Sequence, residues 1–376
     1  MHVNRTLAGA LAAALYAATA SSEPVLEQVI VSAKRISEDA SRLPLAWSVI
    51  NDEALTLIGH THPNEIMQQV PGAWISRGNG QESLTALRSP VLTGAGGCGS
   101  FFMAADGISL RAPGFCNVNQ LFDANIEQAG RIEVIKGPAG ASYGSNAMHG
   151  VINVLSAAPD PAAGQQLAVE AGPDDYYRTK LSLNHAAGRH AFSLRGNVAT
   201  DGGYQDDSGY DQEKLTLRHD YAGDIWNIRT VLDGANLNQE TAGFIQGFEA
   251  YKDDDLRRSN PNPEAYRDAW SLRLYSEASR DIGPDMQLSI TPYLRRNRME
   301  FLQHFLPWQP VETNAHESLG LRTALHGGQG NLSWVGGVDL EITEGSLQEV
   351  QEQPFSPNQP QGVHYDYTVD ASVGAA

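Results

Sequence analysis

From residue 159 to residue 376, apolar and polar residues alternate with a period of two in a series of segments separated by polar turns. Successive side chains of a β-strand point to opposite faces, so each segment predicts a strand with one apolar and one polar face. We expect about nine or ten such strands, with apolar runs that begin at Leu167, Leu181, Phe192, Leu215, Trp226, Trp270, Met286, Leu319, Leu332 and Val338.

Antiparallel strands of this kind fit either a secreted β-sandwich or a membrane barrel with lipid outside and water inside. The connections favour the barrel, because short turns alternate with long polar excursions as they do in outer-membrane barrels. The turns lie at 172–175, 187–188, 222–223 and 327–330, and the excursions at about 233–264 and 297–316.

Residues 43–158 have a mixed pattern, which predicts a small α+β domain. Asn51 or Asp52 can cap a helix through Ile58 that ends at Gly59, and a second helix is expected from Pro63 or Asn64 to Val70. Short strands are expected at 47–50, 73–76, 84–88 and 102–105, with a further pair inside 131–155.

Two glycine motifs suggest chemistry that their surroundings disfavour. Ser142 lies in a G-x-S-x-G sequence, the nucleophile elbow of a secreted serine hydrolase, but Gly150 and Val151 follow too soon for the helix that an elbow requires. Gly94 to Gly99 matches G-x-G-x-x-G, but a strand and a turn follow it instead of a helix, so we expect no dinucleotide site.

The first twenty residues resemble a secretory signal. A short basic start precedes an apolar run from Leu7 to Ala17, and Ala18-Thr-Ala20 is a small-residue cleavage sequence. A membrane-anchoring helix is the alternative, but the run is shorter than the ~20 residues that a spanning helix needs. In an exported chain the two cysteines, Cys98 and Cys116, can form a disulfide; two free thiols are the alternative.

Charge and composition exclude several function classes. The formal net charge of -18 argues against a nucleic-acid partner, because phosphate binding needs clustered Lys and Arg. The 11 histidines form no H-E-x-x-H motif and have no C-x-x-C partner, so we predict no metal site and no cofactor. Loop aromatics are either solvated or in contact with a ligand: Phe244, Phe248, Tyr251, Phe301, Phe305 and Trp308.

A short apolar run, Val29 to Val31, interrupts the polar stretch 21–42. It reads either as an edge strand packed on the domain or as a peptide that another protein captures by strand addition. The pattern alone favours the edge strand.

The stretch 131–155, RIEVIKGPAGASYGSNAMHGVINVL, resembles the plug-domain signature of TonB-dependent outer-membrane receptors. The resemblance extends to Val70-Pro-Gly72, to Leu87-Arg-Ser89 in place of the common I-R-G, and to Ala105-Asp-Gly-Ile108. The sequence departs from the family pattern at Ser89, Lys136 and His149, which limits assignment to a subfamily.

This resemblance implies an α+β plug domain followed by an antiparallel transmembrane β-barrel in the bacterial outer membrane. The segments would be a signal peptide at 1–20, a mobile N-terminus at 21–42, the plug at 43–158 and the first part of the barrel at 159–376. Family members have about 22 strands, so about ten indicate a truncated or partial barrel.

The resemblance also implies a function, which is active transport of a scarce ligand such as a ferric siderophore, another metal chelate or a nutrient. An uncoupled receptor or adhesin is the alternative, and the hydrolase using Ser142 is a remote one. The TonB box, which a TonB-like periplasmic protein would capture, would be Gln28, Val29, Ile30, Val31 and Ser32. We further expect a plug disulfide between Cys98 and Cys116, and ligand contacts from Arg77, Asn79, Ser100, Phe101 and Phe102.

Overall fold

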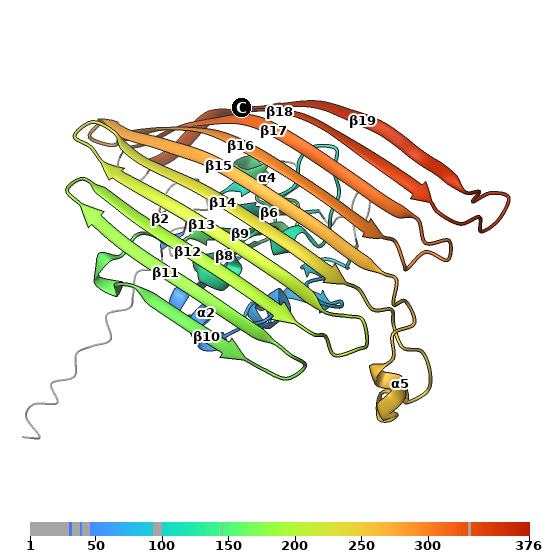
Figure 1. The fold of residues 1–376 in the computed structure, drawn as a ribbon. Coiled ribbons are helices and arrows are strands. Elements are labelled where there is room, and N and C mark those ends of the chain that lie inside the picture. Colours follow the sequence, from blue (N-terminus) through green and yellow to red (C-terminus); the bar gives the residue numbers. More distant parts are fainter. Residues whose placement is uncertain (1–29, 32–37, 40–45, 93–99, 145, 330–331) are drawn as a thin grey trace, which may run out of the picture.

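The computed structural model describes residues 30–31, 38–39, 46–92, 100–144, 146–329 and 332–376. They form two main parts. Residues 46–156 are a small α+β domain, called the N-terminal domain here, and residues 166–375 supply a large antiparallel sheet, called the wall. Figure 1 shows the wall as one continuous curved sheet with the N-terminal domain on one side of it.

The N-terminal domain is built on a mixed five-stranded sheet in the order β3-β8-β9-β6-β7. Strands β8 and β9 pair antiparallel, whereas β6 and β9 pair parallel. The strands of this sheet are β3 (Ala46–Asn51), β6 (Phe101–Ala105), β7 (Ile108–Ser109), β8 (Ala129–Lys136) and β9 (Gly150–Ser156). A separate hairpin consists of β4 (Ala73–Arg77) and β5 (Ser83–Leu87).

The first helix, α2 (Asp52–Ile58), confirms the predicted caps. The Asn51 side chain accepts a hydrogen bond from the Ala54 amide at 2.9 Å, and Gly59 ends the helix at φ 58°. The second helix, α3 (Pro63–Met67), ends three residues before the predicted Val70. The chain tightens there into turns, because the amides of Gln69 and Val70 bond carbonyls three residues back.

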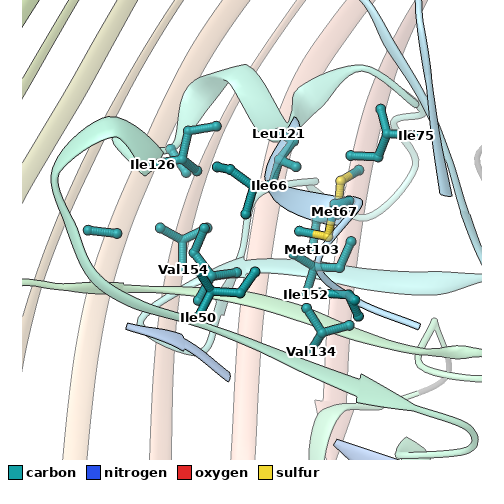
Figure 2. Close-up of a cluster of buried hydrophobic side chains, with 14 of the residues drawn as sticks. Ile50, Ile66, Met67, Ile75, Met103, Leu121, Ile126, Val134, Ile152 and Val154 are labelled. Atoms are coloured by element: carbon teal, nitrogen blue, oxygen red, sulfur yellow. The ribbon is translucent and has the colours of Figure 1, made fainter. Parts of the chain in front are cut away.

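The core of the N-terminal domain lies between its sheet and its helices (Figure 2). Ile66 and Met67 of α3 meet Ile75 of β4 and Met103 of β6 in one buried cluster. Further members come from the short 3₁₀ turns η3 (Gln120–Asp123) and η4 (Ile126–Gln128). Strands β8 and β9 are buried along most of their length, because this cluster covers one face of the sheet and a second cluster with Ile135, Tyr143 and Val151 covers the other.

The wall has ten strands, in agreement with the predicted nine or ten, and each pairs antiparallel with its neighbours in the chain. The strands are β10 (Gln166–Ala171), β11 (Tyr177–Ala187), β12 (His190–Asp201), β13 (Tyr210–Ala222), β14 (Asn227–Glu240), β15 (Tyr266–Gly283), β16 (Met286–Leu302), β17 (Val311–Gln329), β18 (Leu332–Gln351) and β19 (Gly362–Ala375). Short helical turns accompany them: η5 (Pro161–Ala163), η6 (Ala250–Lys252) and α5 (Asp254–Arg258).

The connections differ from the prediction in two respects. The long excursions shrink to 241–265 and 303–310, because β14 and β16 continue as paired strands through the polar residues that suggested loops. The connection 172–176, predicted as a short turn, lies at the same end of the sheet as these loops. We call this end, with connections 172–176, 202–209, 241–265, 303–310 and 352–361, the long-loop rim, and the opposite end the short-turn rim.

The two faces of the wall have opposite character. Side chains that point toward the N-terminal domain are polar and buried, such as Arg178, Lys214 and Arg295. The side chains between them, which point away from the N-terminal domain, are apolar and exposed, such as Leu319 and Leu340. This is the pattern of a sheet with lipid on its outward face. No helix within the described ranges is long and apolar enough to cross a membrane.

Candidate functional site

Arginines on the inward face of the wall hold the N-terminal domain by its backbone. Five strands each contribute one guanidinium that donates to a carbonyl of the domain, at 2.5 to 2.8 Å. The pairs are Arg178 with His60, Arg218 with Ser156, Arg273 with Asp123, Arg295 with Ser109, and Arg322 with Gly107. Hydrogen bonds from a charged donor are stronger than those between neutral groups, so these five contacts attach the domain firmly to the wall.

A buried ion pair joins the same two parts. The Lys214 ammonium of β13 lies 2.9 Å from Oε1 of Glu127 in η4, and the two side chains are 0% and 4% exposed. Lys214 also donates to the Ala124 carbonyl at 2.9 Å. Burial alone would raise the pKa of Glu127, but the adjacent Lys214 ammonium holds that pKa below its ordinary value. Glu127 is therefore a carboxylate where it meets the wall.

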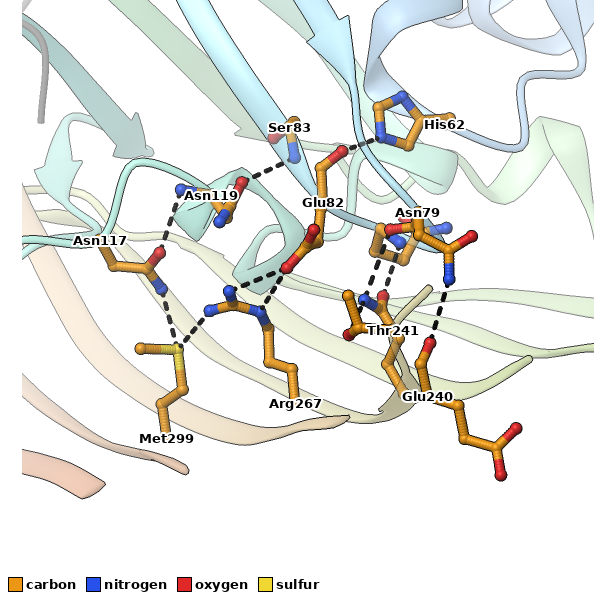
Figure 3. A network of polar contacts seen from close by, with 12 residues as sticks. His62, Asn79, Glu82, Ser83, Asn117, Asn119, Glu240, Thr241, Arg267 and Met299 are labelled. Carbon is orange, nitrogen blue, oxygen red and sulfur yellow. Dashed lines mark hydrogen bonds and ion pairs between the residues drawn. The ribbon is translucent and has the colours of Figure 1, made fainter. Parts of the chain in front are cut away.

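At the long-loop rim, the turn of the β4–β5 hairpin is hydrogen-bonded to the wall (Figure 3). The Asn79 side chain donates to the carbonyls of Ser208 and Glu240, at 3.3 and 3.2 Å. Oε1 of Gln239 accepts the Gln81 amide at 2.7 Å. Arg267 at the start of β15 lies 2.9 Å from Glu82. We call this turn, residues 78–82, the apex turn.

The loop that contains Cys116 is part of the same network. The Met299 sulfur accepts from Arg267 at 3.1 Å and from Asn117 at 3.3 Å. Asn119 in turn accepts the Ser83 amide at 2.7 Å. Figure 3 shows these side chains converging from the wall, from the apex turn and from the loop. A displacement of the apex turn would therefore also disturb the Cys116 loop.

His62 connects the apex turn to α3. Its Nδ1 accepts the Asn64 amide at 3.1 Å, and its Nε2 donates to the Glu82 carbonyl, 2.9 Å away. Accepting at one nitrogen while donating at the other requires the neutral imidazole. Burial, with a smaller contribution from Arg77, lowers the pKa of His62 from 6.5 to about 4.

The predicted ligand contacts separate into two groups. Arg77 and Asn79 lie together at the apex hairpin, where Arg77 is half exposed and 3.5 Å from Glu65. Ser100 and Phe102 instead contact the 137–149 loop, through the His149 amide and the Tyr143 ring. The expectation for Phe101 is wrong, because its side chain is 0% exposed in the core and offers no surface to a ligand.

Several other predicted positions lie outside the described residues. These are residues 1–20, Cys98, the Gly94–Gly99 motif, and Gln28, Val29 and Ser32 of the predicted TonB box. Ile30–Val31 form β1, which pairs with β2 (Glu38–Asp39) in a sheet separate from that of the N-terminal domain. Both interpretations of this segment, an edge strand and a peptide captured by strand addition, stay predictions.

Ser142 lies in α4 (Gly140–Tyr143), a helix of four residues. The apolar strand β9 begins at Gly150, so the G-x-S-x-G sequence lacks the long helix of a nucleophile elbow. The serine occupies the connection between β8 and β9.

Two adjoining cavities lie between the N-terminal domain and strands β15–β19. Their volumes are about 590 and 610 Å³, and both are lined by Gly107, Tyr143 and Arg322. The hydrogen bond from Arg322 to the Gly107 carbonyl crosses the region that they share. The domain is thus packed less tightly against this side of the wall than around Lys214.

The sequence patterns did not reveal Gln239, Arg267 and Met299. Each is one of the alternate residues of its strand that point toward the N-terminal domain. This alternation was the signal that the sequence offered. Their partners are 158 to 185 residues away along the chain, so only the folded structure brings them together.

Comparison with known proteins agrees with this architecture. Residues 39–151 match the model of the TonB-dependent receptor plug domain. The vitamin B12 transporter BtuB of Vibrio vulnificus is 24% identical over 266 residues, which are 70% of this chain and 39% of that protein.

Solved receptors share the fold. The ferripyoverdine receptor of Pseudomonas aeruginosa aligns with a TM-score of 0.73 and 13% identity, over 92% of this chain and 50% of its own. The ferric citrate transporter FecA aligns with a TM-score of 0.70 and 15% identity, over 88% of this chain and 52% of its own. The chain thus spans 39% of the curated relative and about half of each solved receptor. The chain is thus similar to TonB-dependent outer-membrane receptors in two respects: residues 39–151 match their plug domain, and the plug followed by antiparallel wall strands has their fold.

Proposed function

We propose that the chain acts in TonB-dependent uptake of a scarce small molecule across the outer membrane. The single observation that carries the proposal is the apex turn of the plug domain, which is hydrogen-bonded to the wall at the long-loop rim. A ligand that arrives at this rim can change contacts that extend through His62 and Asn119 into the body of the plug domain. The relatives are named as a vitamin B12 transporter, a ferric citrate transporter and a ferripyoverdine receptor, and these names support this class of cargo.

Coupling would run through the predicted TonB box, Gln28 to Ser32. Ile30 and Val31 pair only with Glu38 and Asp39 in the ladder that the structure describes. A pairing of two residues is easily exchanged, which suits capture by strand addition to a TonB-like periplasmic protein. Capture would then pull on the plug domain from its N-terminal side.

Ligand recognition would use the long-loop rim. Arg77 and Asn79 provide polar groups at the apex turn, and the loop 241–265 presents Phe244, Phe248 and Tyr251, which are 79%, 95% and 69% exposed. A disulfide between Cys98 and Cys116 would hold the neighbouring plug loop in shape. Ser100 and Phe102 remain candidates for a second contact, away from the apex turn.

The coupling step is tested with Val31→Pro, because proline lacks the amide that an added strand must donate. Cells that produce the chain would be given radiolabelled cyanocobalamin, ferric citrate or a ferric catecholate, and binding and uptake would be measured separately. For whichever probe binds, we expect Val31→Pro to abolish uptake while binding is retained. Ser41→Pro, ten residues further along, is the matched control and should transport normally.

Two outcomes would overturn the proposal. Uptake that is unchanged in Val31→Pro would indicate an uncoupled receptor or adhesin. Covalent labelling by a fluorophosphonate that is lost in Ser142→Ala would indicate a serine hydrolase instead.

A further inference from the structure

The connections of the long-loop rim carry an excess of negative charge. They contain ten Asp or Glu residues and three Lys or Arg residues, an excess of seven carboxylates. Half of these carboxylates lie in the connection 241–265, whose helix α5 projects beyond the sheet in Figure 1. The connections of the short-turn rim hold only two Asp residues and one Arg. The negative charge is therefore concentrated at the rim where a ligand would arrive.

All three cations of these connections are already paired. Each lies 2.6 or 2.7 Å from a carboxylate of the same rim: Lys252 from Glu249, Arg257 from Asp254, and Arg258 from Asp174. The remaining seven carboxylates form no ion pair with another described residue: Asp175, Asp206, Asp207, Asp253, Asp255, Glu264 and Glu352. At the apex hairpin, Arg77 is paired with Glu65, and Arg267 of the wall with Glu82. An arriving anion would thus meet no unpaired cation among the described residues of these connections and the apex hairpin.

Carboxylates also face the interior of the wall at this rim. Glu312 of β17 and Glu349 of β18 point inward, and Nε2 of Gln303 lies 3.3 and 3.1 Å from one oxygen of each. Burial, with a smaller contribution from the charge of Glu349, raises the pKa of Glu312 above its ordinary value. Two carboxylates that share one neutral donor would be stabilised by a cation placed near them.

Aromatic rings at the same rim already lie against cations. The guanidinium carbon of Arg258 is 4.4 Å from the ring centroid of Tyr204, and the Lys252 ammonium is 5.8 Å from that of Tyr251. The negative face of an aromatic ring attracts a cation. Phe244 and Phe248 of the connection 241–265 are exposed, so their faces are accessible for the same kind of contact.

A surface with one sign of charge raises the local concentration of oppositely charged solutes and speeds their association, by roughly 10 to 10³ in favourable cases. We propose that the long-loop rim selects a ligand that carries positive charge, such as a free ammonium group, over an anionic chelate. This inference rests on the proposed function, because it assigns the charge of the cargo. The shared fold with the ferric citrate transporter is compatible with it, since 15% identity leaves the rim side chains free to differ.

The first test measures the charge of the rim without any ligand. Asn358→Cys places a thiol in the exposed connection 352–361, and Ala222→Cys places one at the short-turn rim. The full chain in detergent micelles is treated with the cationic thiol reagent MTSET or the anionic MTSES, and the parent chain corrects for Cys98 and Cys116. At low salt, the ratio of cationic to anionic rates should be about tenfold higher for Asn358→Cys. In about 1 M salt, where the Debye length is about 3 Å, the two ratios should converge.

Matched double variants identify the source of this ratio. Asp255→Asn with Glu352→Gln removes two exposed carboxylates of the long-loop rim and should lower the ratio at Asn358→Cys. Asp281→Asn with Asp285→Asn removes the same charge near the short-turn rim and should leave that ratio unchanged. Equal ratios at the two rims in the parent background would overturn the inference.

A pair of probes tests the cargo itself. Ferrioxamine B is a ferric trihydroxamate with one free ammonium group, and its N-acetyl derivative lacks that charge. Tryptophan quenching by the iron complex reports binding, and we expect ferrioxamine B to bind more tightly, with a difference that shrinks in Asp255→Asn with Glu352→Gln. Tighter binding of anionic ferric citrate than of either probe would overturn the inference. Cells that transport none of the probes, with the reagent ratios as expected, would instead refute the proposed function alone.

Discussion

At the residue scale, His62 makes the stability of the plug domain depend on pH. Its pKa is lowered from 6.5 to about 4 in the folded chain, chiefly by burial. Between these values the unfolded chain binds a proton that the folded chain does not, so the free energy of unfolding falls as pH drops. The stabilisation is complete above 6.5 and is lost progressively toward 4. From pH 7.5 to pH 5 this histidine should account for a loss of about 2 kcal/mol.

His62→Asn keeps a side-chain acceptor at the start of α3 but cannot titrate. Urea denaturation in detergent at pH 7.5 and pH 5, followed by tryptophan fluorescence, should show a smaller pH-dependent loss in His62→Asn than in the parent. Exposed His185→Asn should behave like the parent. An equal pH-dependent loss in His62→Asn would mean that other groups, such as buried His60, carry the whole effect.

At the element scale, local sequence patterns predicted the strands and the helix caps. They did not predict which distant residues these elements contact. Asn51 and Gly59 delimit α2 because capping depends on neighbours within a few residues. Alternation identified about ten strands because each strand crosses the apolar band on the outward face of the wall. It misjudged where β14 and β16 end, since ladder hydrogen bonds continue past the apolar band into residues such as Asn236 and Glu300. The apex contacts could not be predicted, because they join distant parts of the chain.

The apex turn depends on a glycine at position 80. Gly80 has φ +52°, and a Cβ there would collide with Oε1 of Gln239, the atom that accepts the Gln81 amide. Gly80→Ala should therefore cost ~1–2 kcal/mol for the left-handed backbone, and about 1 kcal/mol more for the lost hydrogen bond. Hydrogen exchange of the peptide that contains residues 78–82 should become faster.

Gly188→Ala separates these two contributions. Gly188 has a similar φ of +61°, but nothing lies within 4 Å of the point where a Cβ would stand. It should lose only the backbone contribution and leave exchange at the apex turn unchanged. Equal stability losses in the two variants, with normal exchange at 78–82, would show that Gln239 does not hold the turn.

At the scale of the whole molecule, the wall carries two opposite surfaces on the same strands. In β17, Arg322 points inward to the Gly107 carbonyl, while its neighbour Leu321 points outward. The outward apolar run on this strand extends from Leu319 to Leu325 and ends at Glu317, which lies 3.9 Å from Arg296 of β16. Strand β17 has 19 residues, whereas ~9–11 suffice to cross a bilayer. The part beyond Glu317 therefore stands in water at the long-loop rim.

This division predicts where the wall tolerates charge. Leu321→Arg places a cation within the lipid-facing band and should cost roughly 2–4 kcal/mol of insertion free energy. Thr313→Arg places the same side chain on the same face, opposite Glu300 and beyond the band, and should cost roughly 0–1 kcal/mol. Urea titration of folding into phospholipid vesicles measures both values for the purified chain. Equal costs at the two positions would mean that the bilayer does not follow the apolar band, whereas a loss confined to Leu321→Arg locates the membrane between the short-turn rim and Glu317.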